Sequence, residues 1–341
     1  MHKKLALILV LLILAGCSKT SDAPLKRFSK SGEFFSSVVN VDVCYAPGQE
    51  VALKRATDEI WARFADIHWR LSVYDPNSDM NRINSSYPNS VTVGADTYGI
   101  IADSLYYNRL SDGMFDITVY PLLKLWKTDE KKNILPSVEE IRAAQAMMGS
   151  DKVQLLDKNQ IRLLNPDTKL TIDSIADGYA ADEAARILRA HGFSNFLVDT
   201  SGELYGGGHN CQGGPWRIGV KDPHDPTHII DVIEMTNTSV TTSGSYEHFY
   251  MIDGKQYSHI IDPKTGFPHN NLISATVIAP SAEFSDFWST ALCLLNPQRG
   301  IELINSLGEG YASMVVVKEG NGKFVKKASR NYARYLSKNL Y

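Results

Sequence analysis

The segment spanning residues 243–268, SGSYEHFYMIDGKQYSHIIDPKTGFP, shows how this chain combines short strands with tight turns. Bulky and polar residues alternate over 246–252, which predicts a strand. Asp253-Gly254 is a typical hairpin turn, and the chain is expected to return as a second strand over 256–261. The segment therefore predicts a β-hairpin that is followed at once by a turn rich in Gly and Pro.

His259 falls within the predicted return strand, just before the turn Asp262-Pro263-Lys264-Thr265-Gly266. A strand that ends in such a turn can deliver a side chain to the edge of a cleft. Histidine titrates nearest to neutral pH, so His259 is a candidate general base. The alternative is a partly buried histidine that is hydrogen-bonded to backbone, and the segment alone does not separate the two.

The composition is that of an ordinary globular protein. The 341 residues are 43% hydrophobic and carry a formal net charge of −3. This length allows a large core, in one domain or in two lobes. The weak charge, and the lack of a dense basic run after the N-terminus, argue against a nucleic-acid partner.

The N-terminus has the pattern of a bacterial lipoprotein signal. A short basic head precedes the apolar run 5–15, which is too short to span a bilayer, and small residues precede Cys17. We expect a signal peptide over 1–16, a lipidated (palmitate-type) Cys17 with a tether over 17–33, and a folded domain over 34–341. The protein would then be extracytoplasmic and lipid-anchored to a membrane, on the periplasmic face if the cell has two. The alternative is an ordinary signal peptide with a chance cysteine.

The remaining cysteines are Cys44, Cys211 and Cys293, which are far apart and form no Cys-x-x-Cys motif. This spacing suggests neither a zinc site nor a thioredoxin-like site. Cys293 lies in an apolar helical run and is expected to be buried. The sequence leaves open whether Cys44 and Cys211 form a disulfide.

Periodicity predicts an α+β fold with a mixed, largely antiparallel sheet flanked by helices. Helices are expected over 49–71, 96–110, 136–148, 174–191 and 282–295. Strands are expected over 34–45, 153–156, 161–164, 169–173, 193–198 and 216–220. The segment 71–84 is expected to be a loop, and Gly206-Gly207-Gly208 a flexible hairpin, since no Gly-Lys-Ser/Thr follows to make a phosphate-binding loop.

The last of these helices carries Asp286 and Thr290 four positions apart, and therefore on one face. Their neighbours in the chain are apolar. A carboxylate on a mostly apolar helix destabilises the fold unless it is paired or binds a cation. The alternative is an aspartate that interacts favourably with the helix N-terminus.

Four stretches, in this order and spacing, resemble the ApbE family of FAD:protein FMN transferases. They are LSVYDPNSDMNRIN, DGMFDITVYPLLKLW, SIADGYAADEAARILRAHGFSNFLVDTSGELYGGG with WRIGVKDP, and VTTSGSYEHFYMIDGKQYSHIIDPKTGFP with VIAPSAEFSDFWSTALCLL. YSHIIDPKTGFP is the most specific of these elements. The resemblance implies a T-fold-like architecture, with FAD as the substrate bound between two lobes. It also implies Mg²⁺-dependent transfer of FMN to a Thr or Ser hydroxyl, release of AMP, and an extracytoplasmic acceptor flavoprotein of the redox-complex type.

The resemblance also assigns roles to residues of this chain. It implies His259 as the general base and a metal site made by Asp286, Thr290 and the backbone carbonyl of Ser174. Oxygen ligands of this kind favour Mg²⁺ over zinc. The implied flavin contacts, with Tyr74 or Phe115 stacking on the ring, are Tyr74, Met114, Phe115, Asp116, Thr171, Asp177 and Ile260.

The chain departs from the family pattern at the polar flavin contacts. Thr171 stands where many members have Asp, with Asp173 two positions on, and Asp177 stands where many have Lys. Ser289 occupies a position that is a second helix Asp in some members. Two other functions stay open from the sequence: a Mg²⁺-dependent FAD pyrophosphatase that yields FMN and AMP, and a non-catalytic flavin-binding lipoprotein.

Overall fold

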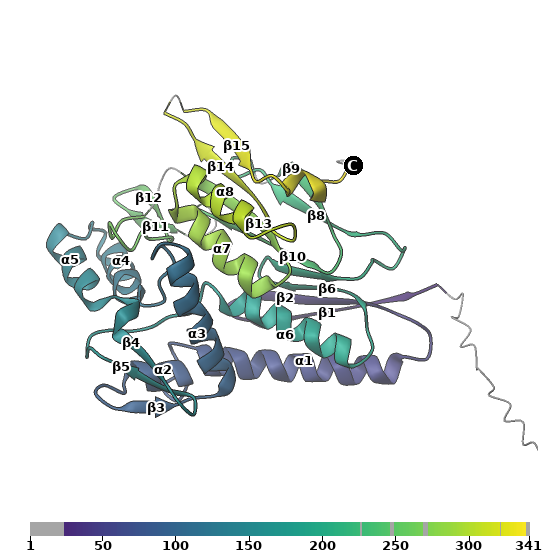
Figure 1. Cartoon of the computed structure of the whole chain (residues 1–341), viewed down its shortest axis with the longest axis horizontal. Helices are drawn as coiled ribbons and strands as arrows, with labels where there is room; N and C mark the ends of the chain where they lie inside the picture. The colour runs from purple at the N-terminus through teal and green to yellow at the C-terminus, as the bar shows by residue number, and fades with distance from the viewer. Residues whose placement is uncertain (1–23, 226, 246–248, 269–271, 321, 339–341) are drawn as a thin grey trace, which may run out of the picture.

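The computed structural model describes residues 24–225, 227–245, 249–268, 272–320 and 322–338. Its largest feature is an eight-stranded sheet in which all neighbouring strands run antiparallel (Figure 1). In order across the sheet, its strands are β1 (Lys26–Phe34), β2 (Ser37–Tyr45), β6 (Asn195–Thr200), β7 (Glu203–Gly207), β10 (Thr238–Gly244), β13 (Leu272–Ala279), β14 (Ala312–Lys318) and β15 (Phe324–Ala328).

Helices cover one face of this sheet (Figure 1). They are α1 (Glu50–Leu71), α6 (Ala176–Ala190), α7 (Ala282–Leu294) and α8 (Pro297–Ser306). Ala180, Ala181 and Ala184 are fully buried along α6, and side chains this small let α6 pack closely between α1 and α7. The other face is covered by the pair β8 (Trp216–Lys221) and β9 (Ile229–Met235), which closes a smaller apolar core.

The rest of the chain forms a second group of elements beside α7 (Figure 1). It comprises α2 (Asp79–Asn84), α3 (Ala95–Leu110), α4 (Tyr120–Lys132), α5 (Val138–Met147), the sheet β3 (Ser90–Thr92), β5 (Gln160–Leu163) and β4 (Val153–Leu156), and the hairpin β11 (Phe249–Ile252) and β12 (Lys255–Ser258). A small core around Leu122, Trp126 and Ile141 joins α4 and α5 to the hairpin. Among the described residues, no helix is both long enough and apolar enough to cross a membrane.

The predicted α+β class, with a large antiparallel sheet flanked by helices, is confirmed. The helices expected from periodicity form within one or two residues of their predicted bounds, and Ser137 caps α5 in a capping box with Glu140. Cys293 is buried, as expected. The division into two lobes stays a prediction, and the signal peptide and Cys17 lie outside the described residues.

The expected tether is shorter than predicted, because β1 begins at Lys26 and pairs with β2 along its whole length. This edge strand is polar on its exposed face, which is why its composition resembles a linker. Phe35 and Ser36 connect the two strands with positive φ values of 53° and 63°, as a tight hairpin turn requires.

Three further expectations were wrong. Gly206-Gly207 ends β7 instead of forming a flexible hairpin. Glycine is required at position 207 because a Cβ there would lie 2.5 Å from the Phe196 ring. Segment 169–173 makes no strand, since the Leu170 N–H donates to the side chain of Asn84 instead of to a strand partner. The expected loop 71–84 contains α2, which Ser78 caps by accepting from the Asn81 N–H.

His259 also lies outside its predicted strand. β12 ends at Ser258, and His259 is the first residue beyond it. The hydroxyl of Ser258 accepts a hydrogen bond from the Ile260 N–H at 3.1 Å, which turns the chain out of the ladder. The expected position of His259 at the mouth of a turn is nevertheless retained.

Cys44 and Cys211 form the disulfide that the sequence left open, and it ties β2 to the loop before β8 across 167 residues of chain. Replacing both cysteines with alanine should lower the free energy of unfolding by about 2–5 kcal/mol, because the open chain gains entropy when unfolded. Denaturant unfolding of the two proteins measures this difference. Replacing the buried thiol Cys293 with alanine is the control for loss of a sulfur atom alone, and equal stability of the double variant and the wild type would contradict the prediction.

Candidate functional site

All site residues named from the sequence line one cavity of about 850 Å³. The cavity is lined by the loop between α1 and α2, the loop between α3 and α4, and α4 itself. Its remaining walls are the loop before α6 with the start of α6, β10, the loop after β12, and α7. The predicted residues on its wall are Tyr74, Met114, Phe115, Asp116, Thr171, Ser174, Asp177, His259, Ile260, Asp286 and Thr290. The fold thus brings together side chains that are up to 216 positions apart in the sequence. Their individual roles stay predictions.

Asp286 forms the buried part of the cavity wall, with 4% of its surface exposed. Its Oδ2 accepts a hydrogen bond from the Gly178 N–H at 3.1 Å. Only glycine fits at this crossing of α6 and α7, because a Cβ there would lie 2.4 Å from the Ala282 carbonyl oxygen. The absence of a side chain at Gly178 therefore sets how closely Asp286 approaches the start of α6.

A second buried carboxylate holds α7 in register with α6. Asp182 on α6 accepts hydrogen bonds from the N–H groups of Ala282 and Glu283, at 2.9 and 3.0 Å, and from the Ser281 hydroxyl at 2.8 Å. These are the donors that the first turn of a helix leaves without an intrahelical partner. Asp182 thereby fixes the end of α7 that precedes Asp286.

Asp286 belongs to a cluster of carboxylates that are buried and close to one another. Burial raises the pKa of Asp286 to about 7. Burial also raises the pKa of Asp177 well above its ordinary value, and the nearby charges of Asp286 and Asp173 raise it further. Such a cluster destabilises the fold when it is ionised, unless a cation shares the site.

The donor atoms here fit Mg²⁺. Asp286, Thr290 and Ser174 all line the cavity and offer oxygen only, and Asp177 adds a further carboxylate. Within the described part of the chain, no group of three or more His, Cys, Asp or Glu side chains could hold a metal ion. Mg²⁺ is usually bound through one or two carboxylates and keeps several waters and phosphate oxygens, which matches the oxygen donors on this wall. The Ser289 hydroxyl is hydrogen-bonded to the Ser243 hydroxyl at 2.7 Å, so this position of α7 carries a neutral group that already has a partner.

His259 lines the cavity from a loop that is anchored to α4 and α5. The Trp126 indole N–H donates to the Gly266 carbonyl at 2.9 Å, and the Gln145 amide donates to the carbonyl oxygens of Pro263 and Lys264. Asp262 completes the turn by accepting from the Lys264 N–H at 2.7 Å. The sequence motif after His259 is therefore a scaffold that holds this side chain at the cavity.

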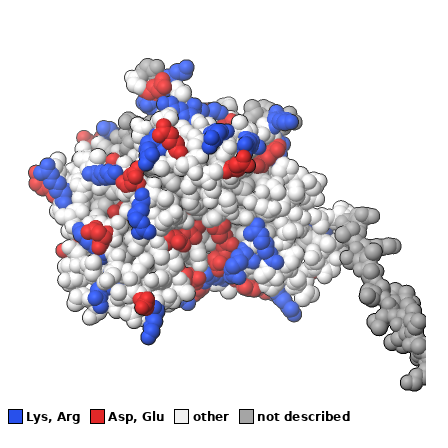
Figure 2. All heavy atoms as spheres, viewed as in Figure 1, with Lys and Arg blue, Asp and Glu red and all other residues white. Residues whose placement is uncertain are grey.

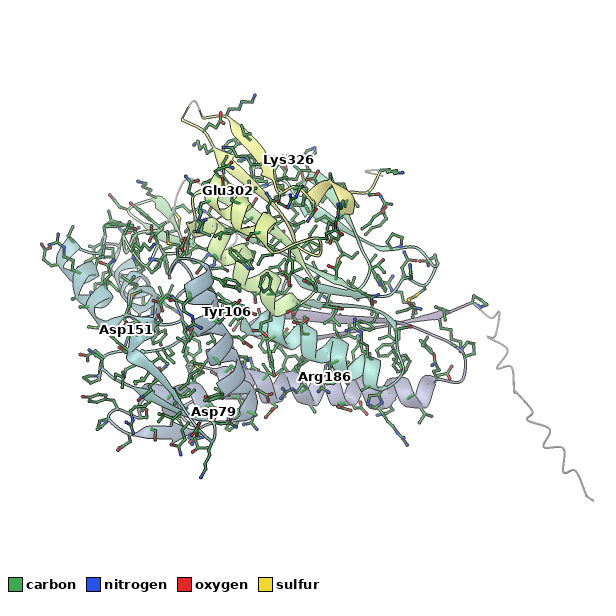
Figure 3. All side chains as sticks on the ribbon, in the orientation of Figure 1. Asp79, Tyr106, Asp151, Arg186, Glu302 and Lys326 are labelled. Carbon is green, nitrogen blue, oxygen red and sulfur yellow. A yellow bond between two sulfur atoms is a disulfide. The ribbon has the colours of Figure 1, made fainter. Side chains whose placement is uncertain are left out.

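Tyr74 is the aromatic ring available to a planar ligand. It is 74% exposed on the cavity wall, whereas the Phe115 side chain is 2% exposed and packs edge-on against Phe287 at 5.0 Å. The expected contact of Phe115 with a flavin stays a prediction, while its ring packs against Phe287 in this structure. The loop that carries Tyr74 is held by Asn81, whose side-chain amide donates to the carbonyl oxygens of Val73 and Asp75 at 2.8 and 2.7 Å. Asp79, at the start of α2 (Figure 3), accepts from the Gly94 N–H and the Thr97 hydroxyl and so ties α2 to α3.

A row of lysines on α4 was missed by the sequence analysis. Lys124, Lys127 and Lys131 line the same cavity as its carboxylates. Their spacing of three and four positions, directly after the motif DGMFDITVYP, could have identified them as one face of a helix. The expectations for that stretch rested on its apolar residues alone.

Glu283, one turn before Asp286, gives a pH prediction. Burial, and then the charges of Asp103, Asp182 and Asp286, raise its pKa from 4.5 to about 8. The folded state thus takes up a proton that the unfolded state has released, so stability should fall as pH rises from about 5 to about 8 and level off above. The loss is at most about 5 kcal/mol, since one pKa unit corresponds to about 1.4 kcal/mol.

The test is urea unfolding between pH 5 and 9 for wild type and Glu283→Gln. We expect the variant, which keeps the shape without the charge, to have a flatter pH profile and higher stability at pH 8. Glu302→Gln on the neighbouring helix α8 is the control for loss of an exposed glutamate charge. Parallel profiles for Glu283→Gln and the wild type would contradict the prediction.

A larger charged network lies away from the cavity, over the junction of α1, α3 and α6 (Figure 2). Arg63 is at its centre, with salt bridges to Asp66, Asp96 and Glu183 at 2.8–3.0 Å. Every one of these bonds is made between side chains of the protein. The network therefore joins the three helices.

Comparison with known proteins gives consistent results. The sequence matches the ApbE family over residues 35–315. It is 35% identical to an FAD:protein FMN transferase of Salmonella typhimurium, over 84% of this chain and 81% of that protein. The structure superposes on the flavin transferase ApbE from Vibrio cholerae with a TM-score of 0.81 and 27% identity, covering 92% of this chain and 100% of the other. It also superposes on an ApbE protein from Thermotoga maritima with a TM-score of 0.82 and 28% identity, covering the same shares.

Proposed function

This chain belongs to the ApbE family, and from that premise we propose that its cavity binds FAD and transfers the FMN half to a Thr or Ser hydroxyl of an acceptor protein, releasing AMP. The chain is an enzyme, an FAD:protein FMN transferase, with FAD as its substrate. The observation that supports this mechanism is that one cavity of about 850 Å³ is lined by His259, Asp286, Thr290 and Tyr74 together.

The chemistry follows from these residue types. The acceptor hydroxyl forms a bond to the flavin-side phosphorus while the bridging P–O bond breaks, and the bridging oxygen leaves with AMP. The hydroxyl proton goes to the imidazole of His259, because a hydroxyl ionises far above neutral pH and attacks poorly while protonated. Tyr74 holds the planar donor by ring stacking.

The carboxylates at the buried end of the cavity would hold Mg²⁺. Asp286, Thr290 and the Ser174 carbonyl are its proposed ligands, with Asp177 beside them. A bound Mg²⁺ supplies positive charge to the pyrophosphate oxygens and to the charge that develops on the leaving phosphate. Support comes from Asp286 itself, because a carboxylate with a pKa raised to about 7 by burial is stabilised by a nearby cation.

We also propose that the enzyme acts outside the cytoplasm, anchored to a membrane by a lipid on Cys17, on acceptor domains of redox complexes. The disulfide between Cys44 and Cys211 supports this location, since such bonds persist in oxidising compartments. Comparing palmitate labelling of the full chain with that of Cys17→Ala tests the anchor. Equal labelling of both would refute it.

The test of the activity is incubation of the chain from residue 24 with FAD and Mg²⁺, with and without an acceptor flavoprotein domain. We expect in-gel flavin fluorescence on the acceptor together with AMP release, and loss of both with EDTA. AMP and free FMN without labelling, using several acceptor domains, would instead identify a pyrophosphatase.

A further inference from the structure

The cavity has an unusual charge balance for a site that takes up an anion. Its wall carries several carboxylates, namely Asp116, Asp173, Asp177, Glu203 and Asp286. The donor that we propose for it bears a negatively charged pyrophosphate. Among the described residues, the lysines on its wall are those of α4: Lys124, Lys127 and Lys131. A site with so much negative charge needs these cations, or bound metal, to attract a phosphate.

The lysines form one continuous stripe along the cavity. Positions 124, 127 and 131 are three and four residues apart, so their side chains leave the same face of α4. Lys127 lies at the centre of this stripe, with its ammonium 5.7 Å from the centroid of the Tyr74 ring. Burial raises the pKa of Tyr120, and the charge of Lys127 partly opposes that rise, which places Lys127 close to both tyrosines.

The buried wall of the cavity carries a carboxylate, whereas its exposed wall carries ammonium groups. Asp286 is 4% exposed, whereas Lys127 and Lys131 are exposed to solvent. The transferred phosphoryl group must lie near His259 and the buried oxygen ligands. The other phosphate belongs to the half of the donor that leaves, and this half must face the open side of the cavity.

We propose that Lys127 and Lys131 bind the phosphate of the adenylate half of the donor, and so hold the leaving group of the reaction. This inference rests on the proposed function and adds a subsite to it. When the bridging P–O bond breaks, the bridging oxygen and its electron pair go to the adenylate, whose phosphate changes from one negative charge to about two. Ammonium groups at that phosphate stabilise the added charge.

The subsite is tested by binding rather than by turnover. FAD and FMN are titrated into the protein by flavin fluorescence in the presence of Mg²⁺, and AMP is measured by its competition with FAD. The proteins compared are the wild type, Lys127→Gln/Lys131→Gln, and Lys132→Gln. Lys132 follows on the same helix but lines a neighbouring cavity of about 640 Å³, so its variant controls for the charge and helicity of α4.

We expect the double variant to bind FAD and AMP about tenfold or more weakly, since a hydrogen bond to a charged group contributes about 1.5–3 kcal/mol. FMN, which lacks the adenylate, should bind within about twofold of the wild type, and Lys132→Gln should match the wild type for every ligand. The FAD affinity of the wild type should also fall more steeply with salt than that of the double variant.

Two results would overturn the proposal. If FMN binding weakens as much as FAD binding, the lysines hold the flavin-side phosphate instead. If no ligand is affected, they are surface charges without a role in binding. FMN transfer to an acceptor is assayed in parallel for the wild type. If the wild type transfers no FMN while the double variant shows a selective loss of AMP binding, the proposed function is rejected and the subsite stands.

Discussion

His259→Ala should lower the rate of FMN transfer to the acceptor by about 10²–10⁴-fold, the contribution expected from a positioned general base. His259 lies on the wall of the cavity. FAD affinity should stay within about twofold, because the proposed role of His259 is toward the acceptor hydroxyl, whereas Tyr74 and the metal ligands are proposed to hold the donor. Single-turnover labelling of the acceptor, followed by in-gel flavin fluorescence, measures the first quantity. Flavin fluorescence titration measures the second.

His209→Ala is the matched control for this experiment. His209 is exposed on a loop beyond β7, and its backbone N–H donates to Asn195 Oδ1 at 2.9 Å. The control should therefore transfer FMN at the wild-type rate. Transfer by His259→Ala within about threefold of the wild type would reject the base, and a loss of FAD binding in parallel with rate would assign His259 to the donor instead.

The features that could be predicted from the sequence are those encoded locally. The spacing of Asp286 and Thr290 puts them on one face of any helix, whatever the rest of the chain does, and α7 forms where its periodicity indicates. Ser137 with Glu140 is a capping box that begins α5 in the same local way. The turn after His259 is recognisable because Asp262 accepts from the next N–H groups of its own loop.

The features that could not be predicted depend on partners distant in sequence. Gly207 resembles a linker residue until the Phe196 ring is placed over it. Leu170 has the pattern of a strand residue, yet its N–H is taken by Asn84, 86 positions away. Phe115 was a candidate for ring stacking because its motif resembles that of the family, but the direction of its ring is decided by tertiary packing against Phe287.

The lysine stripe of α4 was missed for another reason. A charged residue on an amphipathic helix is most often solvated, so Lys127 carries no signal of its own. Its significance appears only when α4 is seen to line the same cavity as Asp177 and Asp286. Charge balance across a cavity is a property of the fold, and no window of sequence contains it.

Asp286→Asn should change activity and stability in opposite directions. FMN transfer should fall by about 10²–10³-fold or more, because a neutral amide is a poor Mg²⁺ ligand and removes a preorganised charge from the site. Without metal, the variant should be more stable than the wild type by about 1–3 kcal/mol at pH 8, where the wild type buries an ionised carboxylate beside Asp177. The shape and the contact with the Gly178 N–H are retained, since the amide oxygen can still accept that bond.

Thermal unfolding with and without Mg²⁺ separates this function from a structural role. Saturating Mg²⁺ should stabilise the wild type by about 3 kcal/mol at 100 times its dissociation constant, and should leave Asp286→Asn unchanged. Asp225→Asn, an exposed carboxylate in the loop between β8 and β9, is the matched control and should respond to Mg²⁺ like the wild type. A variant that is less stable than the wild type without metal would show that Asp286 supports the fold. The buried position of this carboxylate, with its raised pKa, argues the reverse: on the proposed function, the fold tolerates an unfavourable charge there because the charge would bind a cation.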